Sequence, residues 1–282
     1  MKQVKIVTDS TSDLTTEELS KYAITVVPLT VSINGENYTD GENLTKEEFV
    51  LKMQQSEELP KTAQPSIGRF KEVFDELTAD GSEVLAILAS EKLSGTVNAS
   101  RQAAELAEGK VTVVDSGVTT RGLAYQVIAA HLLAQEGKSL EEIIEKIIDI
   151  KRRTKIYLDV VHLDNLTKGG RMSRAKGLLS NLLNIKVFLE FNETEGNTLI
   201  AKGRGMKAIK REFERLKDEY LKIKDDVLVI DFCYVNMTDF NRSIIQMFRD
   251  EFPEAQSIVT HTSPVVAAHA GLEAMGIILV TK

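Results

Sequence analysis

The sequence has 282 residues, of which 43% are hydrophobic and 27% charged, and these values exclude a disordered or low-complexity chain. At about 150 residues per domain, this length predicts two modest domains or one large one. The formal net charge is −7, so the chain has no basic excess with which to bind a nucleic-acid backbone. We therefore expect no nucleic-acid partner.

Cysteine content and hydropathy bear on the cellular compartment. The single cysteine, Cys233, excludes an internal disulfide and the cysteine-rich zinc sites. No apolar run approaches the about 18 residues that would span a bilayer, and Met1 leads into a strand-like run without a signal-peptide core. These observations predict a cytoplasmic protein with no stable membrane insertion. Because the chain has no tryptophan and only 6% aromatic residues, its interior must be largely aliphatic.

The first half of the chain alternates apolar runs with amphipathic stretches. The apolar runs predict strands at residues 4–8, 24–33, 84–88 and 111–114. The amphipathic stretches predict helices at residues 14–22, 46–55, 68–77, 96–107 and 122–135. Short apolar strands between helices are typical of a parallel sheet that is covered on both faces. We therefore predict an α/β domain over residues 1–154.

The pattern changes after a long helix predicted at residues 140–153, which Ser139 opens as an N-cap. Strands are predicted at residues 156–161, 185–191, 198–202, 227–235, 256–260 and 277–280, with a hairpin turn at 193–197 and helices at 207–222 and 239–252. This order predicts an α+β domain with mainly antiparallel strands over residues 155–282. Because no linker rich in proline, serine or glycine separates the halves, we expect them to pack tightly around a cleft.

Polar residues follow the first predicted strand, from Thr8 to Asp13. Open α/β sheets bind ligands at the carboxyl ends of their strands, so this segment is a candidate site. A phosphatase would need a second carboxylate two residues after Asp9, but that position is Thr11. The alternative is structural, with Ser12 or Asp13 capping the next helix. Both interpretations remain open at this stage.

Two turns that carry hydroxyl groups are further candidates. Thr62 lies in the segment Lys61–Ser66, in which Ser66 is the expected N-cap of a helix, and Ser94 and Gly95 connect a strand to another helix. Hydroxyl groups and free amides at helix starts can bind an anion, although an ordinary capped loop would have the same sequence. The motifs GxxxxGK[ST] and GxGxxG are absent from the strand-to-helix junctions, which excludes those two nucleotide-binding folds.

Two arginines beside glycines could bind a carboxylate or a phosphate. Arg171 follows Gly169 and Gly170, and Arg204 lies between two glycines. A solvated salt bridge in a loop is the alternative for Arg171.

The histidines do not indicate a metal site. His131 and His162 are expected to be structural, and His261 and His269 are eight residues apart with no cysteine or carboxylate cluster beside them. His269 is the better candidate for hydrogen bonding an anionic group. A serine hydrolase is not indicated, because GxSxG is absent.

The motifs together resemble the DegV family of bacterial fatty-acid-binding proteins over essentially the whole chain. They are VTDSTSDL at 7–14, KTAQPS at 61–66, LSGT at 93–96, VDS at 114–116, KGGRMS at 168–173 and a segment around His269. The resemblance implies a two-domain α/β protein that holds one long-chain fatty acid in an apolar tunnel. It also implies a non-catalytic carrier without a cofactor, similar to the subunit that presents a fatty acid to a separate ATP-binding kinase subunit for acyl-phosphate formation.

The family pattern also implies roles for individual residues. Thr62 and Ser94 would bind the carboxylate, with Ala63 and Gly95 in the same turns, and His269, Arg171 and Arg204 would lie near the head group. Two other functions are considered, namely a stand-alone small-molecule phosphotransfer enzyme that uses Asp9, Asp115 and His269, and a lipid-sensing regulator.

The sequence departs from the family pattern at three places. Ala63 replaces a usual serine, Val187 replaces a common proline, and Leu272 and Glu273 replace a Pro-Gly turn after His269. Glu273 would disfavour a bound anion unless its side chain points away from it.

Overall fold

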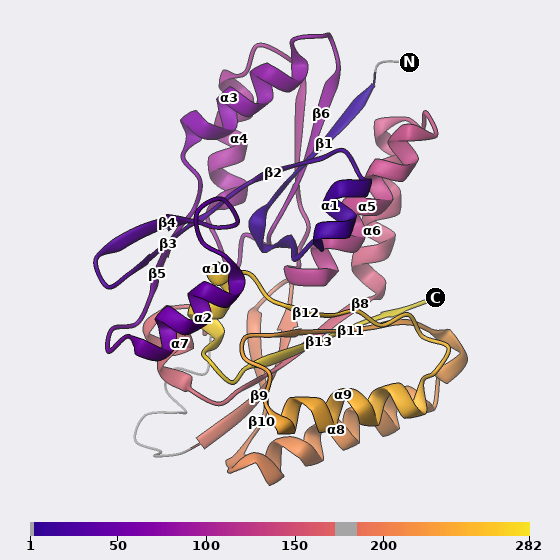
Figure 1. Ribbon diagram of the computed structural model, residues 1–282. Coiled ribbons are helices and arrows are strands. Elements are labelled where there is room, and N and C mark those ends of the chain that lie inside the picture. The colour runs from indigo at the N-terminus through magenta and orange to yellow at the C-terminus, as the bar shows by residue number, and fades with distance from the viewer. Residues whose placement is uncertain (1–2, 173–184) are drawn as a thin grey trace.

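The computed structural model describes residues 3–172 and 185–282, which form three sheets (Figure 1). A four-stranded sheet lies in one lobe and a six-stranded sheet in the other, and a small three-stranded sheet lies beside them. The combination of a parallel and a mainly antiparallel sheet confirms the predicted fold class.

The four-stranded sheet is entirely parallel and is covered on both faces. Its order is β2 (Ile24–Val27), β1 (Val4–Asp9), β6 (Glu83–Leu88) and β7 (Val111–Asp115). Alternate residues of β6 point to opposite faces, as the period of a strand requires. Val84 and Ala86 pack against α3 (Ile67–Thr78) and α4 (Thr96–Leu106), whereas Leu85 and Ile87 pack against α5 (Thr120–Gln135) and α6 (Leu140–Arg153).

The six-stranded sheet holds the second half of the chain. Its order is β10 (Gly196–Arg204), β9 (Ile185–Asn192), β8 (Thr154–Val160), β13 (Met275–Thr281), β11 (Val227–Tyr234) and β12 (Val259–His261). All neighbours are antiparallel except β11 and β12, which are parallel. Helices α8 (Met206–Leu221) and α9 (Asp239–Glu251) cover one face (Figure 1). The hairpin predicted at 193–197 is confirmed between β9 and β10.

The strand predicted at 24–33 is wrong, because it is two strands in different sheets. Pro28 follows β2, which lies at the edge of the parallel sheet and loses its pairing partner where β1 ends, since Asp9 pairs with Val27. The chain then forms β3 (Thr30–Ile33), which pairs with β4 (Glu36–Thr39) and β5 (Lys61–Ala63) in the small sheet. The sequence did not predict this sheet.

The predicted cap of the first helix is also wrong. Ser10–Ser12 forms a 3-10 turn that Asp9 caps, and α1 (Thr16–Lys21) begins only after Thr15. Thr15 accepts from the amide of Glu18, whose carboxylate accepts from the amide of Thr15, so that a capping box fixes the helix start. Ser66 and Ser139 are N-caps as predicted.

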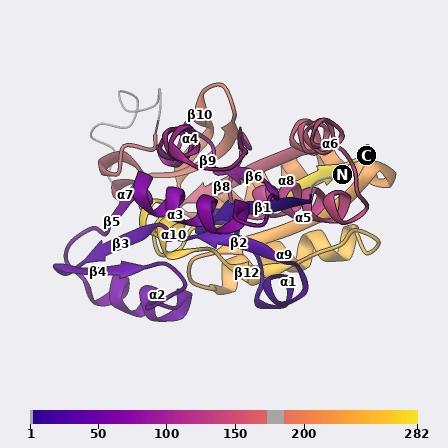
Figure 2. The same ribbon diagram turned by 90° about the horizontal axis from the view of Figure 1, so that it is seen from above.

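The halves of the chain are joined by packing as well as by the backbone. The small sheet and α2 (Lys46–Gln55) share a hydrophobic cluster with α10 (Pro264–Ala270), and these elements lie at the end of the molecule away from the two termini (Figure 2). A buried ion pair also joins the halves, since Arg121 Nε lies 2.9 Å from Asp231 Oδ2 and both side chains are fully buried. No helix in residues 3–172 and 185–282 is long and apolar enough to cross a membrane.

Candidate functional site

A cavity of about 370 Å³ lies where the carboxyl ends of β1 and β6 meet the six-stranded sheet and α10. Both halves of the chain contribute to its wall, which is mostly aliphatic. The apolar lining consists of Leu29, Ala89, Leu93, Ile156, Leu158, Leu166, Phe191, Val235, Val265, Val266, Ala270, Ala274 and Met275. Ala63, Gln64 and Gly95 also line the cavity and are exposed, so the cavity reaches the surface beside them.

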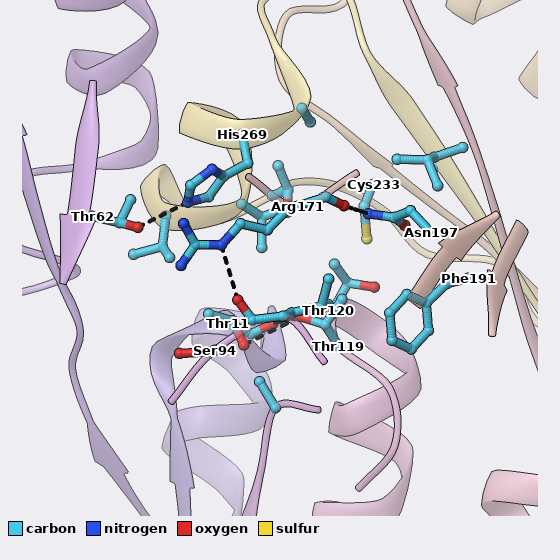
Figure 3. A pocket seen from close by; sticks show the side chains of 18 of the residues that line it. Thr11, Thr62, Ser94, Thr119, Thr120, Arg171, Phe191, Asn197, Cys233 and His269 are labelled. Atoms are coloured by element: carbon cyan, nitrogen blue, oxygen red, sulfur yellow. Dashed lines mark hydrogen bonds between the residues drawn. The ribbon is translucent and has the colours of Figure 1, made fainter. Parts of the chain in front are cut away.

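His269 and Thr62 form a hydrogen bond on the cavity wall (Figure 3), with 2.8 Å between Nε2 and Oγ1. His269 lies in the last turn of α10, and Thr62 is the middle residue of β5. Burial, and then the nearby charge of Arg171, lower the pKa of His269 to about 4. Near neutral pH the imidazole is therefore uncharged, with one nitrogen that donates and one that accepts.

Ser94 and Gly95 lie across from His269, at the start of α4. The Ser94 and Thr96 hydroxyl oxygens are 2.7 Å apart, and Gly95 is the N-cap without a side chain to cap the first amides. A Cβ on Gly95 would lie 2.0 Å from Oε1 of Gln64, so this glycine makes room for the Gln64 side chain. Gln64 is not among the site residues predicted from the sequence, although it lies within the motif at 61–66.

Arg171 crosses the cavity and links the two halves (Figure 3). Its Nε donates to the carbonyl of Leu93 at 3.0 Å, and one terminal nitrogen donates to the carbonyl of Gly169 at 2.7 Å. Burial lowers the pKa of Arg171, but a guanidinium stays protonated in proteins. Its charge has no carboxylate partner among residues 3–172 and 185–282.

Thr62, Ser94, Arg171 and His269 together make the polar end of the cavity (Figure 3). This set combines hydroxyl groups, a neutral imidazole and one unpaired cation, which suits an anionic group better than a cation or a neutral one.

Three threonines form a second polar region on the cavity wall, which we name the hydroxyl shelf: Thr11, Thr119 and Thr120 (Figure 3). Asp9 anchors it by accepting from the amide and hydroxyl of Thr11, at 2.9 and 2.6 Å, and from the amide of Ala89 at 2.7 Å. Thr119 and Thr120 are not among the site residues predicted from the sequence, since nothing in the local sequence shows that the start of α5 faces a cavity.

Six of the seven residues selected as ligand-binding line this one cavity, namely Thr62, Ala63, Ser94, Gly95, Arg171 and His269. Arg204 does not line it, because this residue is exposed at the far end of β10, where it pairs with Ile185. Glu273 points away from the cavity toward His162, with 3.5 Å between the carboxylate and the ring.

The structure gives no support to the phosphotransfer alternative or to a metal site. Asp9 is fully buried with both oxygens accepting hydrogen bonds, and neither Asp9 nor Asp115 lines the cavity. His261 contacts the carbonyl of Val235 at 3.2 Å. Within the described part of the chain, no group of histidine, cysteine and acidic residues could hold a metal ion.

Comparison with known protein families decides the relationship. The model of the DegV family, described as an uncharacterised protein family, matches residues 3–282. The chain belongs to the DegV family. A DegV domain-containing protein from Listeria monocytogenes is 41% identical over 282 residues, which is the full length of both proteins.

Solved structures of DegV proteins have the same fold. A DegV family protein from Thermus thermophilus, described by its fatty acid binding, is 30% identical with a TM-score of 0.87 and covers 99% of this chain and 100% of its own. DegV from Bacillus subtilis, described as a fatty acid binding protein, is 27% identical with a TM-score of 0.88, and the match covers 100% of both chains.

Proposed function

We propose that this protein binds one long-chain fatty acid, with the carboxylate at the polar end of the cavity and the acyl chain along the aliphatic wall. The observation that carries the proposal is the cavity itself, whose lining is mostly apolar, with its polar side chains concentrated in the polar end and the hydroxyl shelf and with Gln64, Asn197 and Thr262 as further polar residues. The exposed residues Ala63 and Gly95 put the polar end beside the surface, so the carboxylate would lie near the mouth.

The acyl chain would supply most of the affinity. Burial of about fourteen methylenes at about 0.8 kcal/mol each gives a gross gain of about 11 kcal/mol, before the costs of ordering the chain. The polar end is then needed chiefly to orient the ligand. Thr62, Ser94 and the neutral His269 can do so by hydrogen bonds, and Arg171 adds a positive charge that is already hydrogen bonded to two carbonyls.

We further propose that the protein is a carrier that presents the bound carboxylate to a separate kinase subunit. In that reaction a carboxylate oxygen attacks the γ-phosphorus of ATP and ADP leaves, which gives an acyl-phosphate. Hydroxyl and imidazole partners leave the carboxylate more nucleophilic than a bidentate arginine pair would. The absence of the two nucleotide-binding motifs from the sequence agrees with a carrier that relies on a partner for ATP.

The binding proposal is tested by titration of delipidated protein with palmitate, together with mass spectrometry of the freshly purified protein after denaturation. We expect one acyl chain per protein, and weaker binding in Thr62→Val and Ser94→Ala. Ser20→Ala is the matched control, since Ser20 is exposed on α1 and bonds only to the Thr16 carbonyl. No copurified acyl chain together with no palmitate binding would remove the proposal.

The carrier role is tested separately, with palmitate-loaded protein, Mg-ATP and a purified fatty acid kinase subunit from a related bacterium. Hydroxylamine traps an acyl-phosphate as the hydroxamate. We expect the hydroxamate only when both proteins are present. Product from this chain alone would indicate a stand-alone enzyme, and no product from the pair would refute the carrier role without affecting fatty acid binding.

A further inference from the structure

Gly276 leaves a gap in the wall of the cavity. It lies in β13, a central strand of the six-stranded sheet, between β8 and β11. It pairs with Leu158 on one side and with Cys233 on the other, and all three residues line the cavity. Since residues that are directly opposite in antiparallel strands point to the same face of the sheet, a side chain at position 276 would project into the cavity.

The backbone of Gly276 is open to a ligand. Its neighbours in β13, Met275 and Ile277, are 1% and 0% exposed, whereas Gly276 and its partner Leu158 are both partly exposed. Gly276 and Leu158 belong to strands that are paired on both sides, and both line the cavity, so their remaining exposure is cavity surface. A molecule in the cavity can therefore contact β13 at this point.

Gly276 lies between the polar end and the far end of the cavity. Figure 3 shows Thr62 and His269 on one side and Phe191 on the other, with Cys233, the strand partner of Gly276, between them. Pairing through β8 places Phe191 two residues, or about 7 Å, further along the sheet than Gly276. A ligand that extends from the polar end to Phe191 therefore passes over Gly276.

Among the described residues, nothing in the packing requires a glycine at this position. Its φ is outside the left-handed range, and a Cβ there would lie 3.6 Å from the carbonyl oxygen of Tyr157 and 3.8 Å from that of Cys233, which are ordinary contact distances. A glycine in the middle of a strand is destabilising and has no side chain to pack. Glycine in a central strand often marks a place where a ligand approaches the backbone closely, and the open cavity surface at Gly276 fits that role.

We propose that Gly276 is a specificity-determining residue, which sets the length of acyl chain that the cavity accepts. The inference rests on the proposed function, because it assumes a fatty acid in the cavity with its carboxylate at the polar end. The acyl chain would cross β13 in contact with the backbone of Gly276, between the side chains of Leu158 and Cys233, and would end toward Phe191. A side chain at position 276 would fill this passage, so that the cavity would hold only chains that end before it.

The experiment measures the affinity of the delipidated protein for a series of saturated fatty acids from octanoate to stearate, in the unmodified protein, Gly276→Ala and Gly276→Val. Each methylene that is kept out of the cavity weakens binding about fourfold. Since alanine adds one carbon and valine adds three, palmitate binding should weaken about fourfold in Gly276→Ala and about 50-fold in Gly276→Val. The ratio of the Kd values of variant and unmodified protein should be near one for octanoate and should rise with chain length.

Thermal unfolding of the delipidated proteins separates this effect from a folding defect. Gly276→Ala should raise the Tm by about 1–4 °C, because alanine is favoured over glycine within a strand. Gly68→Ala is the matched control, since Gly68 is exposed on α3, has room for a Cβ and does not line the cavity. This control should keep its palmitate affinity.

Unchanged palmitate affinity in Gly276→Val would overturn the inference. An equal loss for octanoate and palmitate would overturn it as well, since the change would then act at the polar end. If Gly276→Val does not fold, the dependence on chain length in Gly276→Ala decides in the same way. If the unmodified protein binds no palmitate, the proposed function fails and the inference fails with it.

Discussion

Replacement of Gly169 by alanine tests the packing that orients His269. Gly169 has φ −67° and ψ −12°, a conformation that alanine adopts without strain. A Cβ there would, however, lie 2.5 Å from Nδ1 of His269 and 2.5 Å from the carbonyl oxygen of Asn165. Because neither contact is possible, the imidazole or the backbone must move.

The size of the effect follows from these contacts. Added volume in a packed region costs about 1–3 kcal/mol. If the ring moves, its hydrogen bond to Thr62 is lost as well, at about 0.5–1.5 kcal/mol. We therefore expect Gly169→Ala to lower the free energy of unfolding by about 2–4 kcal/mol, and the Tm by about 3–7 °C. Palmitate binding should weaken several-fold, because the polar end loses its geometry.

Calorimetry and palmitate titration measure the two effects, and Gly170→Ala is the matched control. Gly170 has open space around it but a φ of +76°, so alanine there adds backbone strain without touching His269. This control should lose stability and keep its palmitate affinity. The decisive comparison repeats Gly169→Ala in a His269→Ala background, where the contact with Asn165 remains but the ring is gone. If Gly169→Ala costs as much stability there as in the unmodified protein, the reasoning is refuted.

Three further predictions concern buried ionisable side chains, and urea unfolding measures each. Burial lowers the pKa of His269 to about 4, whereas the imidazole of the unfolded chain has its usual pKa of 6.5, so protonation below pH 6.5 favours the unfolded state. From about pH 7 to 4 the free energy of unfolding of the unmodified protein should therefore fall by up to about 3 kcal/mol more than that of His269→Gln. Parallel plots of unfolding free energy against pH for the two proteins would contradict this. Burial raises the pKa of Asp159 from 3.8 to about 7, so the stability linked to its neutral form is complete below about pH 4 and is lost as the pH rises from about 4 to 7. Asp159→Asn should therefore gain on the unmodified protein between about pH 4 and 7, and a difference that stays constant over this range would be evidence against it. Arg121→Met leaves Asp231 buried without its cation and should cost about 3–5 kcal/mol. The half-exposed Arg101 is the control for Arg121, and Arg101→Met should cost at most about 1 kcal/mol, so similar losses for the two would refute the argument.

The sequence predicted those parts of the fold and of the site that depend on local pattern. Strands and helices with strong periodicity were predicted, and Thr62 and Ser94 were selected because each carries a hydroxyl group in a segment shortly before a helix, although Thr62 belongs to β5 and not to a turn. The break at Pro28 was missed because the apolar run continues through it. Burial and pairing decide that the chain changes sheets there, and the sequence shows neither.

The same reasoning explains the errors within the site. Arg204 resembles Arg171 in having glycine neighbours, but β10 carries it away from the cavity. Asn197 lines the cavity near the start of this strand, and seven further residues at about 3.3 Å each place Arg204 about 23 Å beyond it. Thr119 and Thr120 were missed for the opposite reason, since only the packing of the two halves brings them to the cavity.

The cluster shared by the small sheet and α10 has a consequence for synthesis of the protein. Leu29 is covered by residues such as Val265, which lies 236 positions later in the chain. At about 5–20 residues per second, the ribosome makes α10 about 10–50 s after β3. During that interval the apolar face of the small sheet can pack against α2 but lacks α10. The nascent chain therefore depends on chaperones or on rapid completion to avoid aggregation, and Thr62 meets His269 only after almost the whole chain has been made.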